Sequence, residues 1–203
     1  MVEYIDLMEK EEDLLVEKVD GKKLMEYTEE IAKWVRVSGT REEVESLEYC
    51  EDVLKGFGYE TKLTFHSAFI SVPVSAYVEL EYPERISFEA LAHPFAPSTP
   101  SIGLSGEIVL SQSDSIANKI VLCDGLPSAD EVAMLERFGA IGVIYAQDDN
   151  LHNIPVSPIW GGPTDKTEGL IPNIPVVSVT RGSGQTIKDV IANGRTIIRM
   201  EST

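Results

Sequence analysis

Basic residues, cysteines, histidines and long apolar runs are all scarce in this sequence. Lys and Arg number 17 against 34 Asp and Glu, so the formal net charge is −17, and the acids are spread along the whole chain. A chain without a basic patch repels nucleic acid and anionic membranes. No apolar run reaches the roughly 18 residues that a membrane span requires, and residues 1–17 are too acidic for a signal peptide. We therefore expect a cytoplasmic protein with no nucleic-acid or membrane partner.

The few cysteines and histidines limit the chemistry that this chain can perform. Cys50 and Cys123 have neither the spacing of a metal site nor a secretory context, which favours free thiols in the core. His66, His93 and His152 are the only histidines, and none has a partner that the sequence identifies. No Gly-x-Ser-x-Gly elbow occurs. Surface or hydrogen-bonded loop positions are the simpler interpretation of the histidines, and a small enzyme that uses His93 or His152 is the least supported hypothesis.

Nucleotide binding is the next function to weigh, because "NKIVLCDGLPSADEVAMLERFGAIGVIYAQ" is typical of a strand, a helix and a second strand. Neither G-x-G-x-x-G nor G-x-x-x-x-G-K-[ST] occurs, and the first turn, "DGLPSADE", places acids where a pyrophosphate would lie. The other Gly-rich stretch, "RGSGQT", is better explained as a turn before a capped helix. The pattern therefore indicates a structural unit.

The beginning of the chain carries helical signals. Apolar residues recur at helical spacing in residues 3–19 and again in residues 20–35, where Asp20 is available as the cap. Thr40 and Glu43 have the spacing of a capping box at the start of a third helix. In that helix Leu47, Cys50, Leu54 and Phe57 share one apolar face.

Alternation of apolar and polar residues follows these helices. It predicts a strand over residues 59–65 with one buried face. Prolines and short β-rich runs begin soon afterwards, so we divide the chain into a helical segment, residues 1–72, and a second domain, residues 73–203. The fold class expected from these signals is α/β (α+β).

The second domain shows a succession of short strands. "SVPVSAYVELEYP" predicts one strand, "LAHPFAPSTPSIGLSG" an ordered loop, and "GEIVL" and "KIVLC" two further strands, the last covered on both faces. Asp124 and Gly125 form a turn, Ser128 and Glu131 have capping-box spacing, and Gly139 provides a left-handed exit. We expect Val132, Leu135 and Phe138 to bury this helix. "AIGVIYA" returns parallel to "KIVLC". "NIPVVSVT", "GQTIKDVIANG" and "RTIIRM" predict a strand, a helix and a closing strand.

In order and spacing, these segments resemble the protease-associated (PA) domain over roughly residues 75–200. The most specific parts are Gly-Ala-x-Gly-Val-Ile, residues 139–144, and Ile-Pro-Val-Val-Ser, residues 174–178. "RVSGTREEVESLEYCEDVLKGFGYE" is similar to the N-terminal segment of M28-family zinc peptidases, and "SFEALAHPFAPSTPSIGLSGEIV" to the start of the PA insertion in that family. The resemblance implies a mixed sheet or open barrel with flanking helices, preceded by a helical segment.

The zinc ligands of that family have no counterpart here. M28 peptidases bind two zinc ions through a His-x-Asp pair, a Glu-Glu pair and further ligands, all after the PA insertion. In this sequence the residues two positions after His66, His93 and His152 are Ala68, Phe95 and Ile154. The Glu-Glu pairs that begin at Glu11, Glu29 and Glu42 fall on expected helical faces before the PA-like region. A zinc hydrolase needs three or more ligands with an open position. We expect no cofactor in this chain, and zinc only in a longer parent peptidase.

The resemblance implies a non-catalytic role. The favoured hypothesis is the PA-domain portion of an M28-like aminopeptidase or carboxypeptidase, which covers the active-site cleft and affects substrate access; the alternative is a free-standing PA-type module that binds peptides or proteins. Expected partners are a peptide substrate or a protein, which includes the absent catalytic domain and a second copy of the chain. The loops after the second and third strands of the PA-like region are the candidate contact surface. Their candidate residues are Asp124, Ser128, Asp130, His152, Trp160 and Asp165.

Overall fold

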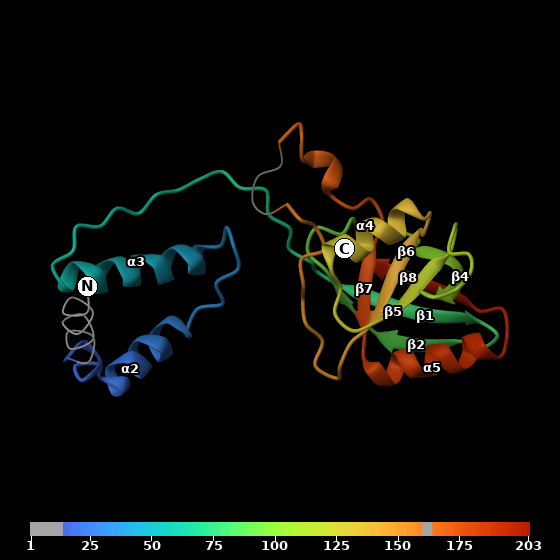
Figure 1. Ribbon diagram of the computed structural model, residues 1–203, viewed down its shortest axis with the longest axis horizontal. Helices are drawn as coiled ribbons and strands as arrows, with labels where there is room; N and C mark the ends of the chain where they lie inside the picture. The colour runs from blue at the N-terminus through green and yellow to red at the C-terminus, as the bar shows by residue number, and fades with distance from the viewer. Residues whose placement is uncertain (1–13, 160–163) are drawn as a thin grey trace, which may run out of the picture. The chain divides into compact units, whose positions relative to one another are not determined.

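The computed structural model describes residues 14–159 and 164–203. The chain divides into two compact units, Met1–His66 and Ser67–Thr203 (Figure 1). Each is described here by itself. Within the described residues, no helix is long and apolar enough to cross a membrane.

The first unit contains two described helices, α2 (Gly21–Ile31) and α3 (Arg41–Gly56). The Asp20 carboxylate accepts the backbone N–H groups of the first turn of α2. Thr40 Oγ1 accepts the Glu43 N–H at 3.3 Å at the start of α3. Both caps predicted from the sequence are thus confirmed, because capping depends on groups only two or three residues apart. The helix expected over residues 3–19 lies largely outside the described residues.

Aromatic contacts join the two helical segments of this unit. The ring of Tyr27 packs edge-on against the ring of Phe57, with the ring centroids 6.3 Å apart. The ring centroids of Trp34 and Tyr49 are 5.9 Å apart. The apolar face expected for α3 is largely uncovered, since Leu47 is 45% exposed and Phe57 is 62% exposed. Two helices can cover each other along only one stripe.

The strand predicted over residues 59–65 does not form. This segment has no regular secondary structure, and Tyr59 and Phe65 are exposed. A strand is stable only when its backbone N–H and C=O groups pair with a neighbour. Residues 59–65 have the alternating pattern, but they pair with no strand of the described chain.

The second unit is built on a mixed sheet of eight strands within the described residues. Their order is β2-β1-β8-β4-β5-β6-β7-β3. The run from β4 to β7 is parallel, and the remaining pairs are antiparallel. The strands are β1 (Ala76–Tyr82), β2 (Ile86–Glu89), β3 (Leu91–Ala92), β4 (Leu104–Leu110), β5 (Ile120–Asp124), β6 (Gly142–Ala146), β7 (Val176–Val179) and β8 (Ile197–Ser202).

The sheet is covered on both faces, as the expected α/β (α+β) class requires. Helix α4 (Ala129–Arg137) and helix α5 (Arg181–Ala192) lie on opposite sides of it (Figure 1), and a short 3-10 helix, η1, spans Glu168–Leu170. Along β5, Ile120 and Leu122 face the core cluster that contains Ile187 of α5, and the alternate residues face the cluster under α4. The continuous apolar run "KIVLC" is therefore a strand buried on both faces, as predicted.

The strand-helix-strand unit from β5 to β6 matches its sequence signals in all but one respect. The Ser128 hydroxyl accepts the Glu131 N–H at 3.3 Å. Gly139 has φ +87°, the left-handed backbone conformation predicted for the end of this helix. β5 and β6 are parallel. Phe138 was expected in the core, but it is 64% exposed. It is the C-cap of α4, so it lies just past the last helical residue and turns away from the sheet.

Strands β2 and β3 and the position of β8 were not anticipated. β8 lies between β1 and β4 and pairs antiparallel with both. Beyond β1 and β8, Ser75 and Thr203 continue the pairing, with the Thr203 N–H donating to the Ser75 carbonyl at 3.0 Å and the Ser75 N–H donating back at 3.2 Å. The residue before β1 and the residue after β8 therefore lie side by side.

Candidate functional site

Three predicted site residues lie in one turn at the carboxyl end of β5. Asp124 is exposed at the end of the strand and forms an ion pair with Lys188 of α5. Ser128 is the N-cap of α4, and Asp130 lies exposed in its first turn. Acidic side chains are favourable at a helix N-terminus, because the free N–H groups there carry partial positive charge. Two of the three thus have structural roles, and Asp130 is directed to solvent.

The loop after β6 begins at the same edge of the sheet. The Gly125 N–H donates to the carbonyl of Ala146 at 2.9 Å, which ties the two loops together. His152 is exposed on this loop, and within the described residues no hydrogen bond or ion pair joins Asp165 to the β5 turn. Trp160 lies outside the described residues. The structure therefore brings Asp124, Ser128 and Asp130 together and leaves His152 and Asp165 separate.

A buried polar network, formed by His93, Gln147 and Ser178, holds the loop after β6. His93 follows β3, Gln147 follows β6, and Ser178 lies in the middle of β7. Ser178 Oγ is 2.7 Å from His93 Nε2 and accepts the Gln147 side-chain N–H at 2.7 Å. All three side chains are buried. The network therefore links the ends of β3 and β6 to the middle of β7.

Both outer members of the network bind the backbone of the loop. The Gln147 side chain accepts the His152 N–H at 2.7 Å and donates to the His152 carbonyl at 3.1 Å. His93 Nδ1 accepts the Ile154 N–H at 3.2 Å. Nδ1 also lies 3.1 Å from the Ile154 carbonyl, so the ring can hold its proton on Nε2, facing Ser178, or on Nδ1, where it is donated to that carbonyl. Two side chains thus replace the backbone partners that this loop lacks.

The sequence offered weak signals for this network. The sequence favours a surface or hydrogen-bonded loop position for His93, and the structure places it in a hydrogen-bonded loop. Ser178 and Gln147 were missed, although each is a lone polar residue next to a run of apolar strand residues. A polar side chain in a strand buried on both faces must find a partner, and that rule could have marked Ser178.

Burial keeps the His93 ring neutral. It lowers the pKa of His93 to about 4, and the hydrogen bond with the Ile154 backbone opposes this effect only in part. A neutral imidazole is required for Nδ1 to accept a hydrogen bond. The low pKa and the hydrogen-bond geometry therefore agree.

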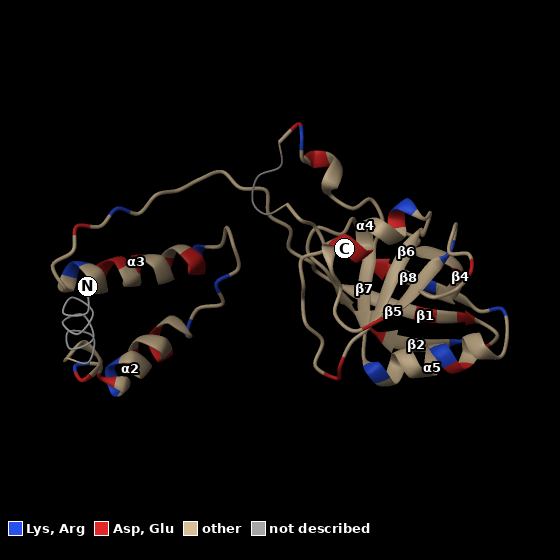
Figure 2. Cartoon of the chain, viewed as in Figure 1, with Lys and Arg blue, Asp and Glu red and all other residues tan. Residues whose placement is uncertain are grey.

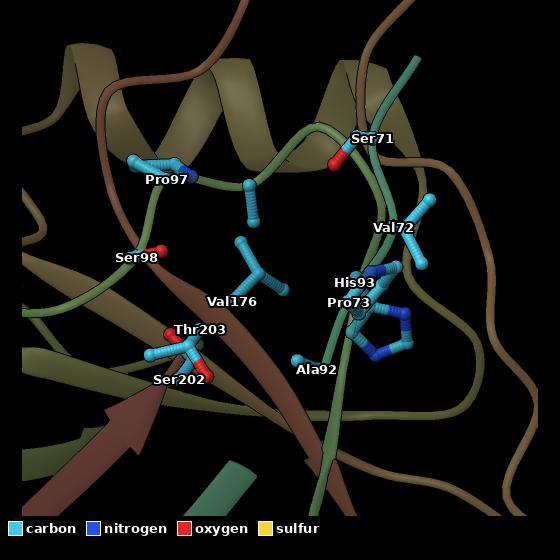
Figure 3. A pocket seen from close by; sticks show the side chains of 11 residues that line it. Ser71, Val72, Pro73, Ala92, His93, Pro97, Ser98, Val176, Ser202 and Thr203 are labelled. Atoms are coloured by element: carbon cyan, nitrogen blue, oxygen red, sulfur yellow. The ribbon is translucent and has the colours of Figure 1, made fainter. Parts of the chain in front are cut away.

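A hollow of about 100 Å³ lies beside His93 (Figure 3). One wall is the extended segment Ser71–Pro73, another is the end of β8, and the His93 ring forms a third. Ligand sites for small molecules usually measure roughly 300–1,000 Å³. This hollow is large enough for a small side chain and too small for a substrate with its leaving group. The lining residues are Ser71, Val72, Pro73, Ala92, His93, Ala96, Pro97, Ser98, Val176, Ser202 and Thr203.

A second set of titratable groups lies in the core under α4. The Tyr145 hydroxyl donates to the Glu131 carboxylate at 2.8 Å, and burial raises the pKa of Tyr145 above its ordinary value. Burial likewise raises the pKa of the Cys123 thiol to about 12. A thiol with such a high pKa is a poor nucleophile at neutral pH. These groups stabilise the core, and they do not form a reactive site.

Metal ligands are not brought together either. In residues 14–159 and 164–203, no three His, Cys, Asp or Glu side chains are grouped in a way that could hold a metal ion. The donor set of a zinc hydrolase is therefore not met by the described residues. Along the ribbon in Figure 2, basic residues are scattered among acidic ones, which agrees with the absence of a basic patch in the described chain.

The region that holds this network matches a known family. Residues 90–187 match the sequence model of the PA domain family. The chain carries a PA domain. His93, Gln147, Ile154 and Ser178 all lie within the matched residues, and the sheet continues beyond them through β1, β2 and β8. The resemblance inferred from the sequence is confirmed.

Solved structures with a similar fold include peptidases. An aminopeptidase from Aneurinibacillus sp. strain AM-1 superposes with a TM-score of 0.64 at 19% identity, over 92% of this chain and 45% of its own. A peptidase M28 precursor from Shewanella amazonensis SB2B superposes with a TM-score of 0.59 at 16% identity, over 87% of this chain and 46% of its own. A zinc aminopeptidase from Bacillus subtilis superposes with a TM-score of 0.55 at 16% identity, over 83% of this chain and 39% of its own. This chain thus spans less than half the length of these peptidases. No curated protein matches the sequence.

Proposed function

We propose that this chain is the non-catalytic, PA-domain portion of an M28-like metallopeptidase. In this role the PA domain covers the active-site cleft and contributes to substrate access or to contacts with a protein partner. The observation that carries the proposal is the shared fold, which extends over 92% of this chain but over only 45% of the aminopeptidase from Aneurinibacillus. More than half of that peptidase has no counterpart in the present sequence.

The pairing of β1 with β8, the first and the last described strands of this sheet, supports insertion of the sheet into a larger domain. Ser75 and Thr203 exchange backbone hydrogen bonds, and their side-chain hydroxyls are 2.8 Å apart. A domain whose first and last residues are adjacent can be inserted into a loop of another domain without stretching either connection. The PA domain has this geometry.

The uncovered face of α3 supports the same role for the first unit. Leu47, Leu54 and Phe57 are exposed together with Tyr59 and Phe65 in the segment that follows. Apolar surface of this kind commonly marks a site of contact with another protein surface. In the proposed peptidase, this face packs against the catalytic domain, and residues 59–65 gain the strand partner that they lack here.

Zinc belongs to the catalytic part in this proposal. The described residues of this chain offer no group of metal ligands, so we expect no zinc-dependent step to be carried out by them. Hydrolysis is assigned to the parent peptidase, and the chain itself is expected to be inactive.

The test compares the chain with the protein that the cell makes from the same gene. The purified chain is assayed on aminoacyl p-nitroanilides with and without added zinc, and the endogenous protein is captured with an antibody against residues 67–203. A captured protein larger than 22.4 kDa with chelator-sensitive aminopeptidase activity supports the proposal. Chelator-sensitive hydrolysis by the purified chain alone overturns it.

The same capture distinguishes the alternative function. A captured protein of 22.4 kDa that binds peptides and hydrolyses none identifies a free-standing PA-type binding module. Cell fractionation during the capture tests the proposed cytoplasmic location, and light scattering of the purified chain tests for a homodimer.

A further inference from the structure

We propose that His93 is a pH-sensitive latch, which fixes residues 148–155 to the PA domain while its ring is neutral and releases them when the ring is protonated. The proposal goes beyond the proposed function, because it depends on the contacts of this loop and not on what the domain binds.

The loop is attached through a small number of contacts. Two of its backbone N–H groups, those of His152 and Ile154, donate to side chains of the network. The Val156 N–H donates to the Pro94 carbonyl at 3.1 Å, and the side chain of Asn153 reaches the Ala92 carbonyl only at 3.4 Å. Val156 is buried in the core under α4 and Ile159 is only 8% exposed, so packing holds the end of the loop. The attachment of residues 148–155 depends on the buried network and on the turn that contains His93.

Protonation is incompatible with the hydrogen bonds observed. The latch requires that the neutral ring carries its proton on Nε2, which faces Ser178 Oγ, so that an added proton goes to Nδ1. There it would confront the Ile154 N–H, which needs an acceptor. The charged ring can donate to the Ile154 carbonyl, 3.1 Å away, but the Ile154 N–H then loses its partner. An unpaired buried donor is costly, and opening of the loop relieves that cost.

No charged side chain compensates a buried imidazolium. The titratable groups of the loop, Asp148, Asp149 and His152, are exposed, and Asp148 pairs with Arg181. The described residues that line the hollow beside the ring, from the segment 71–73, from β7 and from the end of β8, are Ser, Thr, Pro and Val. The pKa of His93, about 4, accordingly reflects burial and a backbone contact and no ion pair.

The direction of the pH effect on loop opening and its pH range follow from the difference between the pKa of His93 in the closed and in the open loop. In the open loop the ring regains its ordinary pKa of 6.5, and in the closed loop its pKa is about 4. The closed state therefore binds fewer protons, so it is fully favoured above pH 6.5 and loses stability as the pH falls toward 4. Between pH 7.5 and 4.5 the open population rises on the order of 50- to 100-fold.

Hydrogen exchange of single amides tests the latch. Protection factors are measured by NMR at pH 7.5 and 4.5 for His152 and Ile154, with the Val143 amide, which donates to the Pro175 carbonyl at 3.0 Å, as the reference. Protection factors are used because the intrinsic exchange rate itself changes with pH. We expect the two loop amides to lose about 50- to 100-fold protection at the lower pH, while Val143 changes little.

Two matched histidine variants identify the group. In His93→Gln the side chain stays neutral, and protection of the loop amides should be equal at both pH values. In His152→Gln, which removes the exposed histidine of the same loop, the pH dependence should persist. Equal pH dependence in the wild type and His93→Gln, or its loss in His152→Gln, overturns the latch.

A measurement on the wild type keeps the proposal testable should His93→Gln fail to fold. The ring nitrogens of His93 are titrated by NMR. We expect a proton on Nε2 at neutral pH and titration well below pH 6.5, in parallel with the loss of Ile154 protection. A midpoint at pH 6.5 with unchanged Ile154 protection contradicts the latch.

Discussion

The Cα atom of Gly184 in α5 faces the methyl group of Ala146 in β6, with no room for a side chain between them. This close approach brings α5 against the parallel part of the sheet, where Ile187 is fully buried. Glycine is required at this position by space and not by backbone conformation, because its φ is helical.

Substitution of Gly184 by Ala should therefore destabilise the PA domain. The added methyl group would overlap Ala146, and overpacking of this kind costs about 1–3 kcal/mol. Gly182→Ala, two residues earlier in the same helix, is the control, because its nearest neighbour is 4.0 Å away. That variant should be unchanged or slightly more stable. Urea unfolding monitored by circular dichroism measures both, and equal stability of the two variants would contradict the packing argument.

Removal of the Tyr145 hydroxyl should weaken the core under α4. Tyr145→Phe keeps the ring and loses the 2.8 Å hydrogen bond to the Glu131 carboxylate. Hydrogen bonds to charged groups contribute about 1.5–3 kcal/mol. Tyr77→Phe removes a hydroxyl that donates to Ser87 at 2.6 Å at an exposed position, so its effect should stay below about 0.5 kcal/mol. The two free energies of unfolding are compared, and a smaller loss for Tyr145→Phe than for Tyr77→Phe would show that the buried bond contributes little.

The two cysteines should differ in reactivity. Burial raises the pKa of Cys123 to about 12, so almost none of it is thiolate at pH 8, and the folded protein covers it. Cys50 is only half-buried. We expect iodoacetamide to modify Cys50 first and Cys123 only after unfolding, as followed by mass spectrometry of tryptic peptides. Cys50→Ser should abolish the early modification, and rapid labelling of Cys123 in that variant would disprove its protection.

Amide exchange should be faster in the first unit than in the PA domain. In the described part of that unit, Ser46 is the one side chain counted as buried in α2 and α3, and Tyr27 and Phe57 supply one of its few aromatic contacts. Regions with little buried apolar surface open at low free energy. Exchange followed by mass spectrometry should label residues 21–56 before β5 and β6. Equal protection in the two regions would argue against this prediction.

The elements that the sequence predicted well are those determined by neighbours in the chain. Asp20, Thr40 and Ser128 cap helices, and Gly139 ends one, because each acts on groups within a few residues. The failure at residues 59–65 has the opposite cause. Alternation determines which face a strand would bury, but it does not supply the neighbouring strand with which the backbone must pair.

The candidate site was harder to predict for the same reason. Its central contact joins His93 and Ser178, which are 85 residues apart, and Gln147 reaches Ser178 across 31 residues. No spacing rule connects such positions, since the order of strands in the sheet brings them together. The candidate loops after β5 and β6 were located correctly as segments, but the polar network that holds the second loop depends on residues inside the strands.

The position of β8 between β1 and β4 also sets the order of events during synthesis. β1 is synthesised early, and β8, its neighbour on one side, ends just before Thr203, which lies 128 residues after Ser75. A ribosome that adds about 5–20 residues per second needs roughly 6 to 25 seconds to cover that distance. During this interval Val78 and Leu80, which are fully buried in the finished domain, have no β8 to cover them. The nascent chain is therefore exposed to aggregation and to chaperones until its last strand has left the ribosome.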